Sequence, residues 1–143
     1  MTSRPGRKNV ERVATDSNVI LSAVSGKAAL RIFTRSTLDV VTTESVLEEV
    51  REYIPYIAEL YGFAPQVLES QLRLLTIREY SLKDYKRYVA EGERRIGDRD
   101  PDDVDLLALA LAMKLPIWSN DNDFKNCGVE WYTTARLLKI LGI

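Results

Sequence analysis

Histidine is missing from this chain of 143 residues, and its absence narrows the chemistry open to the protein. Without an imidazole there is no Ser-His-Asp or Cys-His nucleophilic site, no imidazole general base, and almost none of the common zinc sites. Polar chemistry would then rest on Asp and Glu, whose oxygens bind hard cations such as Mg²⁺ and Mn²⁺. If the protein is an enzyme, we expect it to combine carboxylates with a divalent metal ion.

Cysteine and long apolar runs are also scarce. The single cysteine, Cys127, excludes a disulfide framework within the chain and fits a reducing compartment. No apolar run approaches the roughly 20 residues needed to span a bilayer, and the first ten residues hold no apolar signal core. We therefore expect a cytoplasmic protein with no membrane segment.

Neither sign of charge is in excess. The 20 basic and 21 acidic residues give a net charge of −1, so any binding to nucleic acid needs a local basic patch. Arg4, Arg7 and Lys8 fall in residues 1–11, a polar stretch that predicts a flexible basic arm, either solvated or in contact with phosphates. Residues 12–143 contain no repeat or linker and are expected to form one domain.

Short β-branched segments alternate with helical segments along this domain. Strands are predicted at residues 12–16, 38–43, 75–80, 116–119 and 129–133. Helices are predicted at residues 17–26, 27–33, 44–63, 65–75, 82–99, 100–115 and 134–143. The alternation predicts an α/β fold, a single-domain α/β/α sandwich around a central parallel sheet of four or five strands.

Two of the predicted helices carry more specific expectations. The helix that begins at Glu44 should be perturbed at Pro55, because proline removes a backbone donor. The charged helix over residues 82–99 should turn Tyr85 and Tyr88 inward with its apolar residues, although both rings could instead stack on bases.

Acidic residues follow the ends of the predicted strands. They are Asp16; Glu44, Glu48 and Glu49; Asp121 and Asp123; and, before the helix that leads into 116–119, Asp98, Asp100, Asp102, Asp103 and Asp105. Helix caps and turns explain each group taken alone. However, the carboxyl ends of parallel strands share one edge of a sheet, where carboxylates repel one another unless cations lie between them. Together the groups favour a metal site.

Three segments, taken in order, resemble the motifs of the PIN domain nucleases, a family that includes the virulence-associated protein C toxins of toxin–antitoxin pairs. They are "TDSNVILSA", "TTESVLEEV" and "DPDDVDLLALALAMKLPIWSNDNDF", and the last holds two motifs. Asp103 lies seven residues before the small residue Ala110, and Asp121 follows Ser119 by two, as in the family. Trp118 and Asn120 depart from its usual choices.

The resemblance implies the fold and a set of site residues. The acids implied to be catalytic and metal-binding are Asp16, Glu49, Asp103 and Asp121. Glu48 competes with Glu49 for the second position, and Asp105 and Asp123 are each either an accessory ligand or a structural acid. Asn18 and Ser119 would orient ligands or water through hydrogen bonds.

The activity implied by the resemblance is metal-dependent cleavage of RNA by an endoribonuclease. One or two Mg²⁺ or Mn²⁺ ions would activate a water toward a phosphodiester and stabilise the leaving oxygen, which gives 5′-phosphate and 3′-hydroxyl ends. Phosphate binding needs cations near this acidic centre. The candidates are Arg87, Arg94, Arg95 and Arg99.

The resemblance also implies partners, namely an RNA substrate, an antitoxin protein if the chain is a toxin, and a second copy in a homodimer. Residues 53–63 could offer the dimer surface, although their pattern favours the core. Two alternatives stay open. One is a PIN-like module that only binds RNA or protein, which the complete acid set disfavours. The other is a phospho-accepting receiver domain, disfavoured by the single Asp16 after the first strand and by the absence of lysine from "WSNDND".

Overall fold

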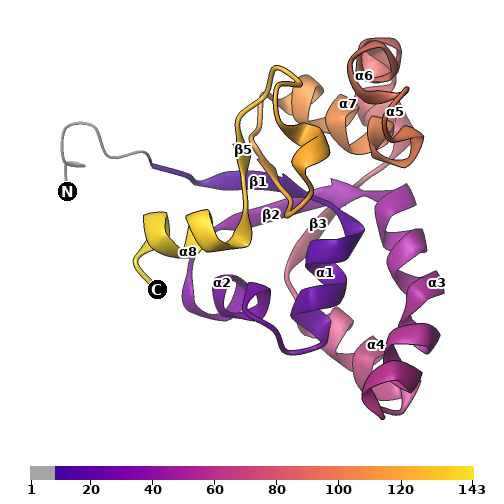
Figure 1. Ribbon diagram of the computed structural model, residues 1–143, viewed down its shortest axis with the longest axis vertical. Coiled ribbons are helices and arrows are strands. Elements are labelled where there is room, and N and C mark those ends of the chain that lie inside the picture. The colour runs from indigo at the N-terminus through magenta and orange to yellow at the C-terminus, as the bar shows by residue number, and fades with distance from the viewer. Residues whose placement is uncertain (1–8) are drawn as a thin grey trace.

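A parallel sheet forms the centre of the domain in this computed structural model, which describes residues 9–143 (Figure 1). The strands are β1 (Arg12–Thr15), β2 (Asp39–Thr43), β3 (Ile77–Tyr80), β4 (Ile117–Trp118) and β5 (Trp131–Tyr132). Five strands pair in the order β3-β2-β1-β4-β5, and every pair is parallel. The predicted fold class is confirmed. The cations of the predicted basic arm, at positions 4, 7 and 8, lie outside the described residues.

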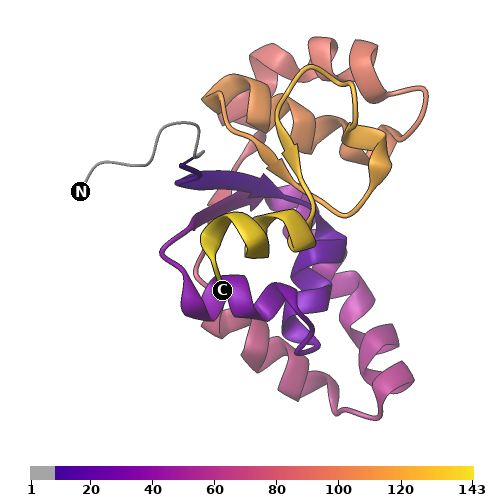
Figure 2. The ribbon, with the colours of Figure 1, turned by 60° about the vertical axis from the view of Figure 1, so that its left-hand side comes forward.

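Helices cover both faces of the sheet, and Figures 1 and 2 show α5, α6 and α7 separated by the sheet from the others. One layer holds α1 (Ser17–Val24), α2 (Ala29–Arg35), α3 (Glu44–Tyr61), α4 (Pro65–Leu74) and α8 (Thr134–Leu141). The other holds α5 (Leu82–Tyr85), α6 (Val89–Ile96) and α7 (Val104–Met113). Neighbouring strand residues point to opposite faces, so Val13 packs in the first core and Ala14 in the second.

The prediction that Pro55 perturbs the helix is wrong, because α3 continues through it to Tyr61. Pro55 is exposed, and water can therefore hydrogen-bond the carbonyl that loses its usual donor. The helix ends at Gly62, which takes the left-handed conformation (φ 75°) that glycine adopts without a steric cost.

The predicted single helix over residues 82–99 is also wrong, because a 3-10 turn, η1 (Lys86–Tyr88), separates α5 from α6. Tyr85 and Ile96 are buried as expected. Tyr88 is exposed, because the tighter turn moves it off the buried face that continuous α-helical spacing would give it. The inward prediction for Tyr88 is therefore corrected.

Residues 53–63, most of which lie in α3, also differ from the prediction. Their sequence pattern favours a place in the core. Ile54 and Ala58 are buried, but Tyr53, Tyr56 and Leu60 on the other side of the helix are exposed. The helix has two apolar stripes, and only one packs against the sheet layer. In residues 9–143, no helix is both long and apolar enough to cross a membrane.

Candidate metal centre

Four aspartates converge where the segment before α7 meets the segment after β4. Asp100, Asp103, Asp121 and Asp123 each offer a carboxylate oxygen, and these oxygens all lie within 4.8 Å of one another. Asp100 caps the 3-10 turn η2 (Pro101–Asp103), and Asp103 is its last residue. Asp121 caps the 3-10 turn η3 (Asn122–Phe124), and Asp123 lies within it. An all-oxygen set of this kind suits a hard divalent cation.

Local capping holds two of these aspartates in place. The Asp100 side chain accepts a hydrogen bond from the N–H of Asp102 (3.2 Å) at the start of η2. The Asp121 side chain accepts one from the N–H of Asp123 (2.9 Å) at the start of η3. Capping and clustering are therefore compatible explanations of these acids, because each cap leaves one carboxylate oxygen free of that bond.

Asp16 is the most constrained acid of the region, with only 6% of its surface exposed. One carboxylate oxygen accepts from the Val19 N–H (3.0 Å) as the N-cap of α1, and the other accepts from the Ser119 hydroxyl. Burial raises the pKa of Asp16, and the charge of Asp121 raises it further, while its two hydrogen bonds act in the opposite direction. The carboxylate of Asp16 therefore interacts with the charge of Asp121 in the cluster.

Asp103 lies at the electrostatic centre of the cluster. Burial, the hydrogen bond and charge of Asp100, and the charges of Asp16 and Asp121 together raise its pKa to about 9. A carboxyl group with such neighbours stays protonated near neutral pH unless a cation compensates them. The unfavourable repulsion between carboxylates therefore belongs to the whole cluster rather than to one residue.

Glu49, on α3 after β2, is not one of the four clustered aspartates but feels the charges of neighbouring acids. Burial raises the pKa of Glu49, and the charges of Asp102, Asp100 and Asp16 raise it further, whereas a hydrogen bond from Ser17 lowers it. Glu48 is exposed on the same helix. The geometry therefore favours Glu49 over Glu48 as the glutamate that faces the site.

Asp105 lies apart from the cluster and links three elements instead. Its carboxylate accepts hydrogen bonds from the Ser45 hydroxyl (3.1 Å) on α3 and from the Tyr85 hydroxyl (3.2 Å) on α5. Burial raises the pKa of Tyr85 to about 12, and the charge of Asp105 adds to the effect. Of the two roles left open by the sequence, these contacts favour the structural one for Asp105, whereas Asp123 lies within the cluster.

Ser119 connects the two halves of the site. Its hydroxyl donates to Asp16 and accepts from the N–H of Asp121 (3.0 Å), which fits the orienting role expected for it. The other expected orienting residue, Asn18, is exposed in the first turn of α1.

A second set of contacts, missed at the sequence level, fixes the loop that carries Asp121. Asn120 accepts from the Thr134 N–H (2.8 Å) and donates to the Thr134 hydroxyl (3.1 Å), which also accepts from the Trp118 indole (2.9 Å). Trp118 and Asn120 are the two residues that depart from the usual motif, and that departure was the available signal. Both hold the loop against the start of α8.

An acidic groove of about 400 Å³ adjoins the cluster on the side of α3. Its carboxylates are those of Glu48, Glu49, Glu52, Asp102 and Asp105, and Tyr53 forms part of its wall. Without a bound cation, negative charge on this side repels phosphates.

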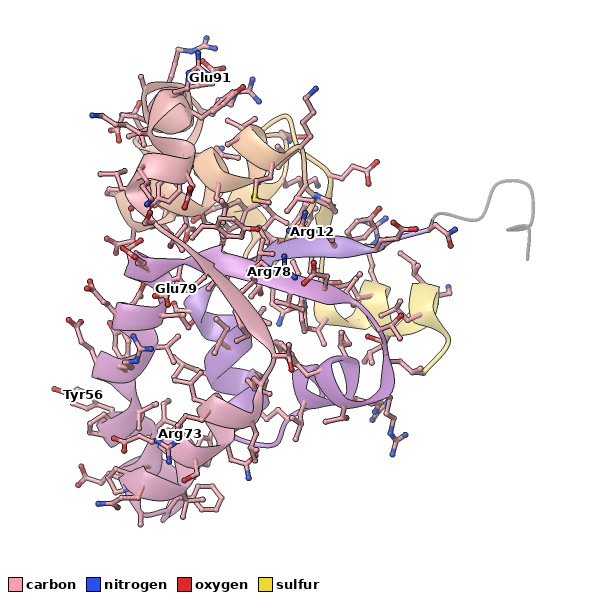
Figure 3. The ribbon with its side chains drawn as sticks, turned by 180° about the vertical axis from the view of Figure 1, so that it is seen from behind. Arg12, Tyr56, Arg73, Arg78, Glu79 and Glu91 are labelled. Atoms are coloured by element: carbon pink, nitrogen blue, oxygen red, sulfur yellow. The ribbon has the colours of Figure 1, made fainter. Side chains whose placement is uncertain are left out.

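The four arginines predicted to bind RNA differ in their surroundings. Arg94 and Arg95 both form ion pairs with Glu91, which Figure 3 labels on α6. Arg95 also donates to the carbonyl of Cys127 (3.0 Å) and so holds the loop after η3. Arg87 and Arg99 are exposed, and neither forms an ion pair with another residue in 9–143.

Comparisons with known proteins agree with this architecture. A family model described as "PIN domain" matches residues 14–141. The VapBC2 complex of Rickettsia felis, solved on a promoter DNA fragment, includes a similar chain (TM-score 0.64, 12% identity, 85% of this chain and 98% of that chain). So do a toxin–antitoxin complex from Klebsiella pneumoniae (0.63, 18%, 85% and 97%) and FitAcB from Neisseria gonorrhoeae (0.60, 15%, 86% and 98%). The search of curated proteins gave no match.

Proposed function

The chain belongs to the PIN domain family, and we propose that it is a metal-dependent endoribonuclease. The proposal assigns Asp16, Glu49, Asp103 and Asp121 as the acids that hold one or two Mg²⁺ or Mn²⁺ ions, with Asp123 as an accessory ligand. The observation that carries it is the convergence of the carboxylate oxygens of Asp100, Asp103, Asp121 and Asp123 within 4.8 Å of one another, without a cation from the described residues paired to any of them. Asp16 and Glu49 lie outside these four aspartates and are coupled to them by charge.

The donor set fits the proposed ions. Carboxylate oxygens are ligands for hard cations, and the raised pKa of Asp103 marks a place where positive charge is favourable. When bound, such ions would activate a water toward a phosphodiester phosphorus and stabilise the leaving oxygen, without any need for histidine. The choice between magnesium and manganese stays open in this proposal.

Side chains of the protein would orient the acids, the water and the substrate. The Ser119 hydroxyl donates a hydrogen bond to the carboxylate of Asp16 and accepts one from the N–H of Asp121. Ser119 therefore fixes the two acids relative to each other. Asn18, which is exposed and follows Asp16 by two residues in the sequence, is proposed to orient water or substrate by hydrogen bonds. Positioning of this kind lowers the reorganisation needed during reaction.

The RNA-binding proposal keeps all four predicted arginines but ranks them by their contacts. Arg99 and Arg87 are the better candidates, because Arg94 and Arg95 are already compensated by Glu91. Arg99 also stands next to Asp100 of the cluster in the sequence, so phosphates bound there would lie beside the carboxylates. The acidic groove, on the side of α3, is disfavoured for RNA.

We extend the proposal to partners. The similar structure from Klebsiella pneumoniae is described as a toxin–antitoxin complex, which supports a role for this chain as a toxin held by an antitoxin protein. A homodimer and a cytoplasmic location stay predictions from the sequence and from the family resemblance.

Cleavage of a mixed pool of structured RNA in Mn²⁺ tests the activity. Wild type should cleave, and both EDTA and Asp103→Asn should abolish cleavage. Asp98→Asn is the matched control, because Asp98 is an exposed aspartate outside the cluster and its loss should leave cleavage intact. Cleavage that survives Asp103→Asn would contradict the site assignment. Absent cleavage with intact Mn²⁺ binding would favour the alternative, a PIN-like module that only binds RNA or protein.

A further inference from the structure

Helix α2 and the turn before it carry a row of positive charges. Lys27, Arg31 and Arg35 follow one another by four positions, so they lie on one side of the helix at steps of roughly 6 Å. All three residues are exposed, and none forms an ion pair with another residue in 9–143. These three residues are called the basic row below.

Acidic residues are missing from the sequence around the basic row. No Asp or Glu occurs in residues 17–38, although the whole chain holds 21 acids. Residues 131–143, which include α8, hold none either, and α8 lies beside α2 (Figures 1 and 2). A shallow hollow of about 250 Å³ is lined by all three cations and by no acidic side chain. In a chain with a net charge of −1, this part of the surface is therefore distinctly positive.

Contacts with α3 hold one member of the basic row in place. The Nζ of Lys27 donates a hydrogen bond to the Tyr61 hydroxyl (2.7 Å) and lies over the Tyr61 ring, 4.9 Å from its centroid. Neither contact neutralises the charge, so the ammonium group can still meet an anion. A cation that is already positioned loses less side-chain entropy when it binds a ligand.

The composition of this surface favours a phosphate backbone as its ligand. None of the exposed large apolar side chains of residues 9–143 lies on α2 or α8. Helices that bind membranes combine basic residues with apolar residues that enter the bilayer, and the centres of protein interfaces are apolar. A row of cations without exposed apolar neighbours instead fits a nucleic acid, whose regularly spaced phosphates supply most of the affinity.

The basic row and the proposed metal site lie at opposite ends of α1. Asp16 caps the first turn of this helix, whereas Lys27 comes three positions after its last residue, Val24. The eight residues of α1 span about 12 Å, and the row extends over about 12 Å more. At roughly 3 Å per nucleotide along a helical strand, about four to eight nucleotides separate a bond at the site from the row.

We propose that the basic row is a second RNA-binding surface, which holds phosphates several nucleotides away from the bond that is cut. It raises the affinity for long RNA and takes no part in the chemistry. Because it contacts phosphates, it reads no base sequence. The choice of RNA as the ligand rests on the proposed nuclease function, whereas the binding of a phosphate backbone does not.

Binding without metal tests this surface in the absence of cleavage. The full chain in EDTA is titrated into a labelled RNA of about 30 nucleotides, and fluorescence anisotropy gives the affinity at several salt concentrations. Arg31→Ala combined with Arg35→Ala should weaken binding by about tenfold. The same pair should lower the slope of log affinity against log salt by roughly 1.4–1.8.

A second pair of arginines is the matched control. Arg51→Ala combined with Arg73→Ala removes the same charge from exposed positions on α3 and α4, and it should change affinity and slope much less. Equal effects of the two pairs would overturn the proposal. Tighter binding of DNA than of RNA of the same sequence would overturn the choice of RNA.

The length of the RNA separates anchoring from a general loss of activity. Replacing Arg31 and Arg35 should raise KM for the 30-nucleotide RNA by about tenfold and leave kcat unchanged, because the contact is equally strong before and during the reaction. Cleavage of an RNA of about four nucleotides, too short to reach the row, should keep its wild-type rate. Equal slowing of both RNAs would contradict a remote contact.

Failure of this proposal can be told apart from failure of the nuclease. An inactive protein whose RNA binding depends on Arg31 and Arg35, but not on the control pair, would refute only the nuclease. An active nuclease that cleaves the long RNA equally well with either pair replaced would refute only the second surface.

Discussion

Replacing Asp103 by Asn should make the metal-free protein more stable, and increasingly so as pH rises. The folded protein holds a proton on Asp103 because burial and neighbouring acids raise its pKa to about 9, whereas the unfolded chain releases it near 3.8. Between these values the folded state binds more protons than the unfolded state, so wild-type stability falls as pH increases. Asn is neutral at every pH and can still donate a hydrogen bond to Asp100.

The size of the effect follows from the shift after a discount for solvent. Each pKa unit corresponds to about 1.4 kcal/mol. Asp103 is only partly buried, so solvent screening reduces the electrostatic free energy to roughly 1.5–3 kcal/mol. For a chain of this size that is a difference in Tm of roughly 5–10 °C. We expect the gap at pH 8 and a much smaller gap at pH 4, close to the pH at which the unfolded chain releases the Asp103 proton.

Calorimetry of EDTA-treated protein at the two pH values measures this, with Asp98→Asn as a control that should melt like wild type. Adding Mn²⁺ at about 100 times its dissociation constant should raise wild-type stability by about 2.7 kcal/mol, and it should raise the stability of Asp103→Asn less. A metal-free wild type that melts as high as the variant at pH 8 would refute the electrostatic argument. Equal gains from Mn²⁺ would refute the role of Asp103 as a ligand.

Three smaller predictions concern the surroundings of the site. Tyr85→Phe removes a buried hydrogen bond to Asp105 and should cost about 1 kcal/mol in urea unfolding, whereas Tyr88→Phe, on an exposed ring, should cost almost nothing. Asn120→Ala loses two hydrogen bonds and should cost about 1–2 kcal/mol in the same assay, so an unchanged midpoint would contradict the anchoring of the loop. Arg99→Ala should weaken RNA binding and lower the slope of log affinity against log salt by about one, and Arg94→Ala should do so less; the reverse order would contradict the ranking.

The approach of Asp16 to Asp121 could be predicted from the sequence because it follows from sheet topology. Asp16 comes directly after β1, and Asp121 follows the end of β4 by three residues. The two strands are neighbours, and parallel strands bring their carboxyl ends together. Asp100 was harder to assign, because its sequence signature is that of a helix cap. The structure gives it that cap and a place in the cluster as well.

Other features depended on information that local patterns do not hold. Two apolar stripes on α3 compete for the core, and periodicity alone does not say which one meets the sheet layer. Helical spacing in the sequence predicts that Tyr88 faces inward, but a 3-10 turn directs its side chain toward solvent. The bonds from Asn120 to Thr134 span 14 positions and join a loop to a helix start, so the departure of Asn120 from the family motif marked this residue but did not identify its partner.

The strand order also has a consequence for the time at which the protein could become active. Ser119 and Asp16, which share a hydrogen bond at the centre of the site, are separated by 103 positions. A ribosome would make Asp16 early and reach Asp121 only after most of the chain described here, so a growing chain would carry an incomplete set of carboxylates. If the protein cuts RNA, the transcript being translated would thus be spared by the nascent product until β4 has joined the sheet beside β1.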